Sequence, residues 1–203
     1  MPRPRSLTRE DIAVAALTVV DRDGVSGLSM RAVASELGTS AMALYRYVDD
    51  REQLERWIVD HVQAAVDLSL PTPASWQQQI VALLERSRRA VTAHPGVVPL
   101  LLVHRHASTA SLRLIEAMLA VLAEAGFSGE RRVVAQRSLI KYLLGSLQVE
   151  HLGPLTGRGT HAMAELSVTE FPYVVETARV ARQLTSDEEF RAGLAALLRG
   201  LSS

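Results

Sequence analysis

The sequence predicts an all-α protein, with a small N-terminal helical unit followed by a larger helical region. Apolar residues recur three and four positions apart through most of the chain, as they do on one face of a helix. Serine, threonine or aspartate stands before several of these stretches, where its side chain can accept a backbone hydrogen bond and begin a helix. No stretch shows the two-residue alternation of a half-buried strand.

The composition is that of a globular protein without covalent cross-links. Of the 203 residues, 48% are hydrophobic, which is enough to bury a core. The absence of cysteine excludes disulfides and thiolate metal sites and suits a reducing cytoplasm. No apolar run reaches the roughly 20 residues that span a bilayer, and no signal peptide is evident. We therefore expect a cytoplasmic protein with no membrane partner.

The charge balance does not identify a partner by itself. The 22 basic residues equal the 22 acidic ones, and Lys141 is the only lysine. Arginine suits phosphates and guanine edges because it is a forked, permanently charged donor, although a GC-rich genome also produces an arginine excess. Up to residue 63 the chain has eight arginines and ten acidic residues. A nucleic-acid function therefore has to come from the arrangement of particular side chains.

Two longer helices are expected on either side of a pair of short ones. Thr8 and Asp11 have the spacing of a helix start, and Gly24 is expected to end that helix. Asp49 and Glu52 have capping-box spacing and predict a connecting helix that runs to about residue 68. A proline-containing stretch then interrupts the chain.

Residues 29–48, between these helices, have the pattern of a helix-turn-helix. A short helix is expected to begin at Ser29 and to be broken by Gly38, and a second begins at residue 39 or 40. Helices joined by so tight a turn need a small residue at their contact, here Ala34, and a residue that tolerates positive φ in the turn. Many ordinary helical hairpins share this spacing. The buried side is expected to consist of Val33, Leu37, Leu44 and Val48.

The outer face of the second short helix is suited to a major groove about 12 Å wide. Its apolar residues can touch thymine methyl groups but cannot read hydrogen-bond donors or acceptors. The best candidates for hydrogen bonds to guanine are therefore Arg31 and Arg46. The residues expected on this face are Ala41, Met42, Tyr45, Arg46 and Tyr47.

The remainder of the chain also predicts helices. They are expected near residues 74–93, 97–104, 109–125, 129–152, 172–183 and 187–200. The stretch from Gly153 to Gly159 is expected to be a flexible loop because glycine and proline are concentrated there.

One set of N-terminal residues covers about the first 60 positions: Leu7-Thr8-Arg9-Glu10, Ala15-Ala16, Gly24, Leu28-Ser29-Met30-Arg31, Ala34, Leu37-Gly38, Leu44-Tyr45-Arg46-Tyr47-Val48, Arg51 and Leu54. This set resembles the N-terminal domain of the tetracycline-repressor family. The rest of the chain is similar, more weakly, to the tetracycline-repressor branch, through Ser69-Leu70-Pro71, Trp76, Glu124-Ala125-Gly126-Phe127-Ser128, Leu144-Gly145, Phe171-Pro172, and a closing stretch from Phe190 to Leu201.

The resemblance implies a ligand-responsive transcriptional regulator that acts as a repressor. Such a protein binds palindromic operator DNA as a homodimer through the major groove and is released by a small effector, here of unknown identity. It needs no cofactor and no metal, and it is not an enzyme. The implied domains are a helix-turn-helix DNA-binding domain at 1–48, a connecting helix at 49–69, and a helical ligand-binding and dimerisation domain at 70–203.

The resemblance also implies roles for particular residues at the DNA. Arg31 matches a position that approaches the duplex, and Tyr45 and Tyr47 match positions whose hydroxyls reach phosphates. Arg51 matches a basic position that holds a phosphate. Hydroxyl side chains nearby either bind phosphate or only cap helices. The full set expected at the DNA is Ser29, Arg31, Thr39, Ser40, Ala41, Met42, Tyr45, Arg46, Tyr47 and Arg51.

A ligand cavity and a dimer interface are implied for the second domain, although each residue offered for them is also suited to an ordinary core or surface role. The ligand candidates are Trp76, His104, Tyr142, Gln148, His151 and Phe171. The candidates for the dimer interface, which form stripes on two helices, are Ile140, Leu144, Leu147, Phe190, Leu194, Leu197 and Leu198.

Two other classes of function remain to be weighed. An enzyme is suggested only by histidines near one another, and His104 and His106 are one residue apart, a spacing that does not share a helix face. A helical interaction module, or a regulator that lacks DNA binding, is suggested by the acid-rich N-terminal region and its apolar recognition face.

Overall fold

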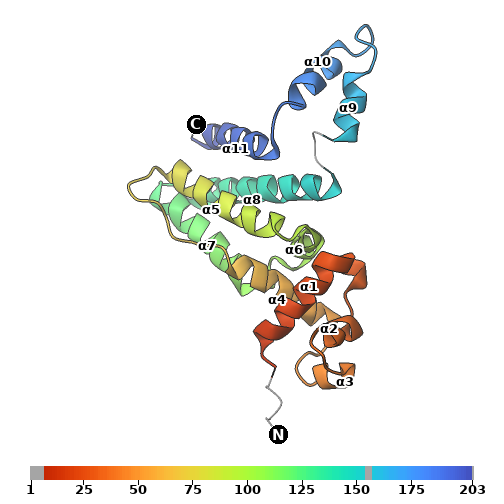
Figure 1. The fold of residues 1–203 in the computed structure, drawn as a ribbon. Helices are drawn as coiled ribbons and strands as arrows, with labels where there is room; N and C mark the ends of the chain where they lie inside the picture. The colour runs from red at the N-terminus through yellow and green to blue at the C-terminus, as the bar shows by residue number, and fades with distance from the viewer. Residues whose placement is uncertain (1–6, 154–156, 203) are drawn as a thin grey trace. The chain divides into compact units, whose positions relative to one another are not determined.

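The computed structural model describes residues 7–153 and 157–202, and within them the chain forms helices and no strand. The predicted all-α fold is therefore confirmed. Figure 1 shows the helices, which in chain order are α1 (Arg9–Gly27), α2 (Met30–Glu36), α3 (Ala41–Leu44), α4 (Arg51–Ala64), α5 (Trp76–Thr92), the 3-10 turn η1 (Pro95–Val97), α6 (Val98–His104), α7 (Thr109–Glu124), α8 (Gly129–Leu152), α9 (Arg158–Ala164), α10 (Pro172–Ala181) and α11 (Ser186–Leu201).

The described chain divides into two compact units. The first extends to Gly126 and contains α1 to α7, and the second begins at Phe127 and contains α8 to α11. Within the first unit, α4 contacts α1, α5, α6 and α7. Within the second, α8 packs against α11, and α9 packs against α10. Helix α1 also contacts η1, so α4 and η1 both join the N-terminal helix to the helices that follow.

The start of α1 follows the sequence prediction. The Thr8 hydroxyl accepts a hydrogen bond from the Asp11 amide at 3.1 Å, and the Asp11 carboxylate accepts one from the Thr8 amide at 2.9 Å, which closes a capping box. Gly24 interrupts the helix with φ of 70°, after which a short turn completes it. The apolar residues that recur at helical spacing along α1 are buried: Ile12, Ala15, Ala16, Val19 and Val20.

The start of α4 corrects the sequence prediction by one residue. The cap is Asp50, whose carboxylate accepts from the Gln53 amide at 2.7 Å, rather than Asp49 with Glu52. The Gln53 side chain in turn accepts from the Asp49 amide at 2.9 Å. Both pairs have the same spacing, but the Glu52 carboxylate pairs with Arg56, whereas the Gln53 side chain accepts from the Asp49 amide before the helix. The helix also ends at Ala64, earlier than the expected residue 68.

A second correction concerns the expected loop at Gly153–Gly159. Residues 154–156 lie outside the described part, but α9 begins at Arg158 within the expected loop and runs to Ala164. The sequence gives little sign of this helix, because it is only about two turns long and Gly157 supplies no side-chain cap. Thr160 and Ala164, one turn apart, form its buried side.

None of the described helices is both long enough and apolar enough to cross a bilayer.

Candidate nucleic-acid interface

The turn between α2 and α3 has the geometry that the spacing of Ala34 and Gly38 predicts. The Gly38 amide donates to the Ser35 carbonyl at 3.1 Å, and the Thr39 amide donates to the Ala34 carbonyl at 2.9 Å. This pair of hydrogen bonds is the Schellman motif that closes a helix when the next residue is left-handed. Gly38 has φ of +63°, so a residue without a Cβ is favoured here. Ala34 is buried beside the turn.

The segment from α3 to Val48 exposes the side chains that we expected to face DNA. Exposed fractions are 77% for Met42, 51% for Tyr45 and 38% for Tyr47, and Arg46 is also exposed. Leu44 and Val48 are buried and hold this segment to the core. The regular helix ends at Leu44, so the residues from Tyr45 to Tyr47 project from a turn rather than from a longer helix as expected. We call Met42, Tyr45, Arg46 and Tyr47 the recognition surface.

The hydroxyl residues around this surface act as helix caps. The Ser29 hydroxyl accepts from the Ala32 amide at 3.1 Å, and the Ser40 hydroxyl accepts from the Ala43 amide at 3.2 Å. The structure thus gives these two serines a structural role, and each hydroxyl keeps its proton for a further acceptor. Thr39 is half-buried and Ala41 is partly exposed.

The acidic residues of the N-terminal region are largely engaged within the unit, whereas two arginines are not. Asp21 pairs with His94 (2.7 Å between Oδ2 and Nδ1), and Asp23 and Glu36 both pair with Arg22. The Asp49 and Asp50 carboxylates are held at the start of α4, as described above. Arg31 and Arg46 are exposed, and their guanidinium groups make no ion pair or hydrogen bond with any described residue. Arg31 and Arg46 therefore keep free guanidinium groups, although acids outnumber arginines in this region.

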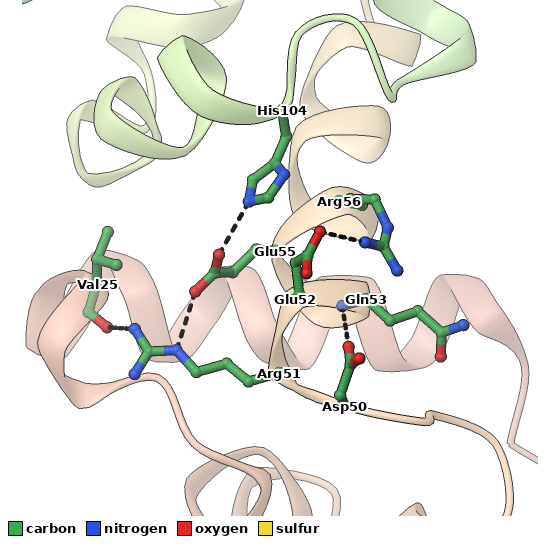
Figure 2. Close-up of polar contacts among 8 residues, drawn as sticks. All are labelled: Val25, Asp50, Arg51, Glu52, Gln53, Glu55, Arg56 and His104. Atoms are coloured by element: carbon green, nitrogen blue, oxygen red, sulfur yellow. Dashed lines mark hydrogen bonds and ion pairs between the residues drawn. The ribbon is translucent and has the colours of Figure 1, made fainter.

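Arg51, another residue expected at the DNA, is held by a chain of polar contacts that ends at His104 (Figure 2). Its Nε donates to Glu55 Oε1 at 2.9 Å, and its Nη2 donates to the Val25 carbonyl at 2.9 Å. The other oxygen of Glu55 lies 2.9 Å from Nε2 of His104, the last residue of α6. Nothing in the sequence indicates that Glu55 joins a DNA candidate to a ligand candidate, because His104 and Glu55 are 49 residues apart.

A second carboxylate of α4 makes a similar connection. Asp60 accepts from the Ser108 hydroxyl and from the Ala110 amide, both at 2.9 Å, and pairs with Arg9 at 2.9 Å. Burial raises the pKa of the Asp60 carboxyl, but the hydrogen bonds from Ala110 and Ser108 and the charge of Arg9 outweigh it, so that this pKa lies below its ordinary value. Glu55 and Asp60 thus tie the segment from His104 to Ala110 to the two ends of α1.

The ligand candidates are distributed over both units. Trp76 begins α5, and the buried His104 ends α6, both in the first unit. The other four belong to the second unit: Tyr142 and Gln148 are partly exposed on α8, and His151 and Phe171 are exposed. In this unit Tyr142 and Phe190 line a pocket of about 350 Å³ between α8 and α11, where the Tyr142 hydroxyl donates to the Phe190 carbonyl at 2.9 Å.

The dimer candidates also differ in exposure. Those that are partly exposed on the surface of the chain are Ile140, Leu144 and Leu197. Those that are already buried in the single chain are Leu147, Phe190, Leu194 and Leu198. A contact with a second copy therefore has the first group, rather than the second, available to it.

Sequence reasoning did not find the buried polar atoms that lack a partner. Oε1 of Gln63 and the hydroxyls of Ser87 and Ser111 are buried on α4, α5 and α7, which pack against one another, and no described residue bonds to them. Gln148, a ligand candidate, has the same property at its Oε1. No group of three or more histidine or acidic side chains suited to a metal occurs in the described ranges.

Comparisons with known proteins agree with this architecture. Residues 12–55 match the family described as bacterial regulatory proteins of the tetR family, and residues 70–203 match the tetracyclin repressor-like C-terminal domain. An HTH-type transcriptional regulator of Saccharopolyspora erythraea is 33% identical over 144 residues, which cover 71% of this chain and 61% of that relative's own length.

Two further relatives match nearly the whole chain. The class E tetracycline repressor protein of Escherichia coli is 26% identical over 205 residues, covering 97% of this chain and 92% of the repressor. The structure of the TetR family protein ActR of Streptomyces coelicolor in complex with (S)-DNPA superposes with a TM-score of 0.83, at 26% identity, over 96% of each chain. The chain belongs to the tetracycline-repressor family of transcriptional regulators and is a DNA-binding regulator rather than an enzyme.

Proposed function

We propose that this regulator is a cytoplasmic repressor that binds a palindromic operator as a homodimer and is released by a small effector. The observation that carries the proposal is the recognition surface itself. Met42, Tyr45, Arg46 and Tyr47 are exposed together, while Leu44 and Val48 fix the segment to the core. A short rigid segment that presents a guanidinium and two phenol hydroxyls suits base edges and phosphates in a major groove.

The roles within this surface follow from the chemistry of each side chain. Arg46 and Arg31 have free guanidinium groups, which suit the O6 and N7 acceptors of guanine. The hydroxyls of Tyr45 and Tyr47 suit phosphate oxygens, and Met42 suits a thymine methyl group. Arg51 keeps its Nη1 edge unbonded to any described residue, so it can hold a phosphate while Glu55 and Val25 hold its other nitrogens.

A homodimer supplies the two-fold symmetry that a palindrome requires. Two recognition segments have to meet successive major grooves, about 34–36 Å apart along the duplex. The partly exposed leucines and isoleucine of α8 and α11 (Ile140, Leu144 and Leu197) are the side chains we propose for the contact. Apolar residues left partly exposed on neighbouring helices suit burial against a second copy.

The effector role rests on the relatives and on the segment around His104. ActR has been crystallised in complex with (S)-DNPA, and the tetracycline repressors are named for a small molecule. In this chain the segment from His104 to Ala110 is bonded to α4, so a ligand that displaces it also displaces the helix that carries Arg51. A ligand shifts DNA affinity only to the extent that it prefers one of the two arrangements. We propose Trp76, His104, Tyr142, Gln148, His151 and Phe171 as the first positions to examine for effector contact.

A regulator without DNA binding is the competing interpretation, and it rested on the acid-rich N-terminal region and on the apolar recognition face. Arg31 and Arg46 support DNA binding instead, because both are exposed with free guanidinium groups, while Asp23 and Glu36 are paired with Arg22.

A gel-shift experiment with the purified protein and the DNA that flanks its gene tests the proposal. The expected result is a retarded complex that unlabelled flanking DNA displaces and unrelated DNA does not. A broad panel of small molecules should then contain at least one that releases the complex, and sedimentation should give a dimer. Failure to retard any flanking fragment contradicts DNA binding, and a retarded complex that no compound releases contradicts induction alone.

A further inference from the structure

Glu55 makes two contacts: one with Arg51, which its helical spacing explains, and one with His104, which its sequence position does not explain. It lies on α4, one turn beyond Arg51, and its side chain is 18% exposed. Each of its two oxygens has its own partner: Oε1 accepts from Arg51 Nε, and Oε2 lies 2.9 Å from Nε2 of His104. With both oxygens engaged, the carboxylate is fixed in one orientation (Figure 2).

The contact with His104 is the more buried of the two. The His104 side chain is 7% exposed, whereas the Arg51 side chain is 46% exposed. Hydrogen bonds to a charged group are strong where water is excluded, so the contact with His104 holds the Glu55 carboxylate in place. The carboxylate in turn holds the Arg51 side chain. Without His104, Glu55 has one oxygen unpaired in a half-buried place and is free to turn away from Arg51.

The contact between Glu55 and Arg51 fixes the long and flexible Arg51 side chain. Arg51 donates through Nε to Glu55 and through Nη2 to the Val25 carbonyl, at 2.9 Å in both cases. These two contacts hold the plane of the guanidinium and leave Nη1 without a bond to any described residue. A side chain that is already ordered loses less conformational entropy when it binds a phosphate, and binds it more tightly for that reason.

We infer that Glu55 and His104 are positioning residues for operator binding: neither touches DNA, but together they hold Arg51 in the orientation in which it binds a phosphate. The inference rests on the proposed function, since it needs Arg51 to contact DNA. Glu55 and the buried His104, at the end of α6, are thereby added to the residues that set operator affinity.

For the variant Glu55→Gln, charge alone predicts the opposite change in DNA affinity from the positioning role. Glu55→Gln removes a negative charge near DNA, and charge alone would tighten binding. If Glu55 positions Arg51, the same change weakens binding. Glu52→Gln is the matched control, because Glu52 is also an acidic residue of α4, pairs with Arg56 at 2.6 Å, and has no bond to Arg51 or His104 (Figure 2).

The experiment measures the dissociation constant, and its salt dependence, for the flanking DNA fragment that the protein retards in the gel-shift experiment. Wild type, Arg51→Ala, His104→Ala and the double variant form a double-mutant cycle, with Glu55→Gln, Glu52→Gln and His104→Gln measured beside it. Thermal unfolding of each variant confirms that it is folded at the temperature used. The proteins are full-length.

The inference predicts that His104→Ala and Glu55→Gln each weaken binding by about 3- to 10-fold, as expected when an ordered contact side chain becomes free. Both should also reduce the slope of log K against log salt towards that of Arg51→Ala, which loses about one unit. The double variant should bind no more weakly than Arg51→Ala alone. His104→Gln, whose amide can donate to Glu55, should restore most of the affinity, and Glu52→Gln should not weaken binding.

Three results would overturn the inference. The first is a His104→Ala effect of equal size with and without Arg51, which indicates a general structural role. The second is unchanged or tighter binding in Glu55→Gln. The third is an Arg51→Ala variant that binds as wild type, which removes the Arg51 contact as well. The first two leave the proposed function intact, because wild-type protein still binds its operator.

Discussion

The carboxylate of Asp60 accepts a 2.9 Å hydrogen bond from the hydroxyl of Ser108, so that a side chain of α4 caps the start of α7 from 48 residues away in sequence. The same oxygen accepts from the Ala110 amide, and the other oxygen pairs with Arg9 at the start of α1. Asp60 therefore joins three helices of the first unit through one charged group. This geometry leads to a prediction about acid stability.

We expect Asp60 to contribute stability that acid removes. Its pKa lies below the ordinary value in the folded protein, so the contribution is present at neutral pH and is lost as the pH falls below about 4, through the folded-state pKa. Asp60→Asn should lower the free energy of unfolding at pH 7 by about 1–3 kcal/mol, because a charged acceptor of hydrogen bonds from Ser108, Ala110 and Arg9 is lost. Urea unfolding from pH 7 to pH 3 should show a smaller decline for Asp60→Asn than for wild type. Glu124→Gln, at an exposed carboxyl, is the control and should decline as wild type does.

Gly38→Ala should destabilise the first unit by about 1 kcal/mol. Nothing lies within 4 Å of the added methyl group, so the expected loss comes from the left-handed backbone alone. Gly38→Asn should lose less, because asparagine adopts this conformation more readily than alanine. Thermal or urea unfolding measures the stability of both variants. A Gly38→Ala variant as stable as the wild type would contradict the backbone argument.

Substitution by alanine should affect stability differently at two buried serines, Ser87 and Ser108. The Ser87 hydroxyl is fully buried and bonds to no described residue, so Ser87→Ala removes an unsatisfied polar atom and should leave stability unchanged or raise it. The Ser108 hydroxyl donates to Asp60 and accepts from the Ser111 amide, so Ser108→Ala should lower stability by about 1–3 kcal/mol. Urea unfolding compares the two variants, and a large loss in Ser87→Ala would show that its hydroxyl has a partner.

Arg46→Ala should weaken binding to the operator by about 1–3 kcal/mol if Arg46 reads one base, and should relax the sequence preference at that base. Binding to unrelated DNA should change much less, since a base contact carries sequence information and a phosphate contact does not. Fluorescence anisotropy with operator and single-base variants measures both effects. Arg113→Ala, which removes an exposed arginine on α7, is the charge-matched control. A uniform loss on every sequence would instead place Arg46 at a phosphate.

The sequence predicted those parts of the fold that depend on near neighbours in the chain. Thr8, Ser29 and Ser40 cap helices because a side chain and an amide three residues apart are enough to specify that geometry. Gly38 was predictable for a similar reason, since a tight turn needs one residue with positive φ. At α4 two overlapping pairs had the same spacing, and the prediction chose the wrong one.

The parts that sequence reasoning missed depend on contacts between distant residues. Glu55 and Asp60 looked like ordinary exposed acids of an amphipathic helix, because their partners His104 and Ser108 are about 50 residues away. The recognition surface was predicted from spacing and from the resemblance, yet the ending of α3 at Leu44 was not, since turn and helix residues there share the same apolar pattern. Helix α9 is only about two turns long and begins inside the glycine-containing stretch that was predicted to be a loop, so no local pattern indicated it.

Hydroxyl-radical footprinting of the protein, read by mass spectrometry with and without flanking DNA, tests the recognition surface most directly. Methionine and tyrosine are readily oxidised, and Met42, Tyr45 and Tyr47 are exposed in the free protein. We expect DNA to lower the oxidation of all three, while the exposed Met163 and Tyr173 of the second unit stay as reactive as before. Unchanged oxidation of Met42, Tyr45 and Tyr47 in a complex that demonstrably contains DNA would contradict it.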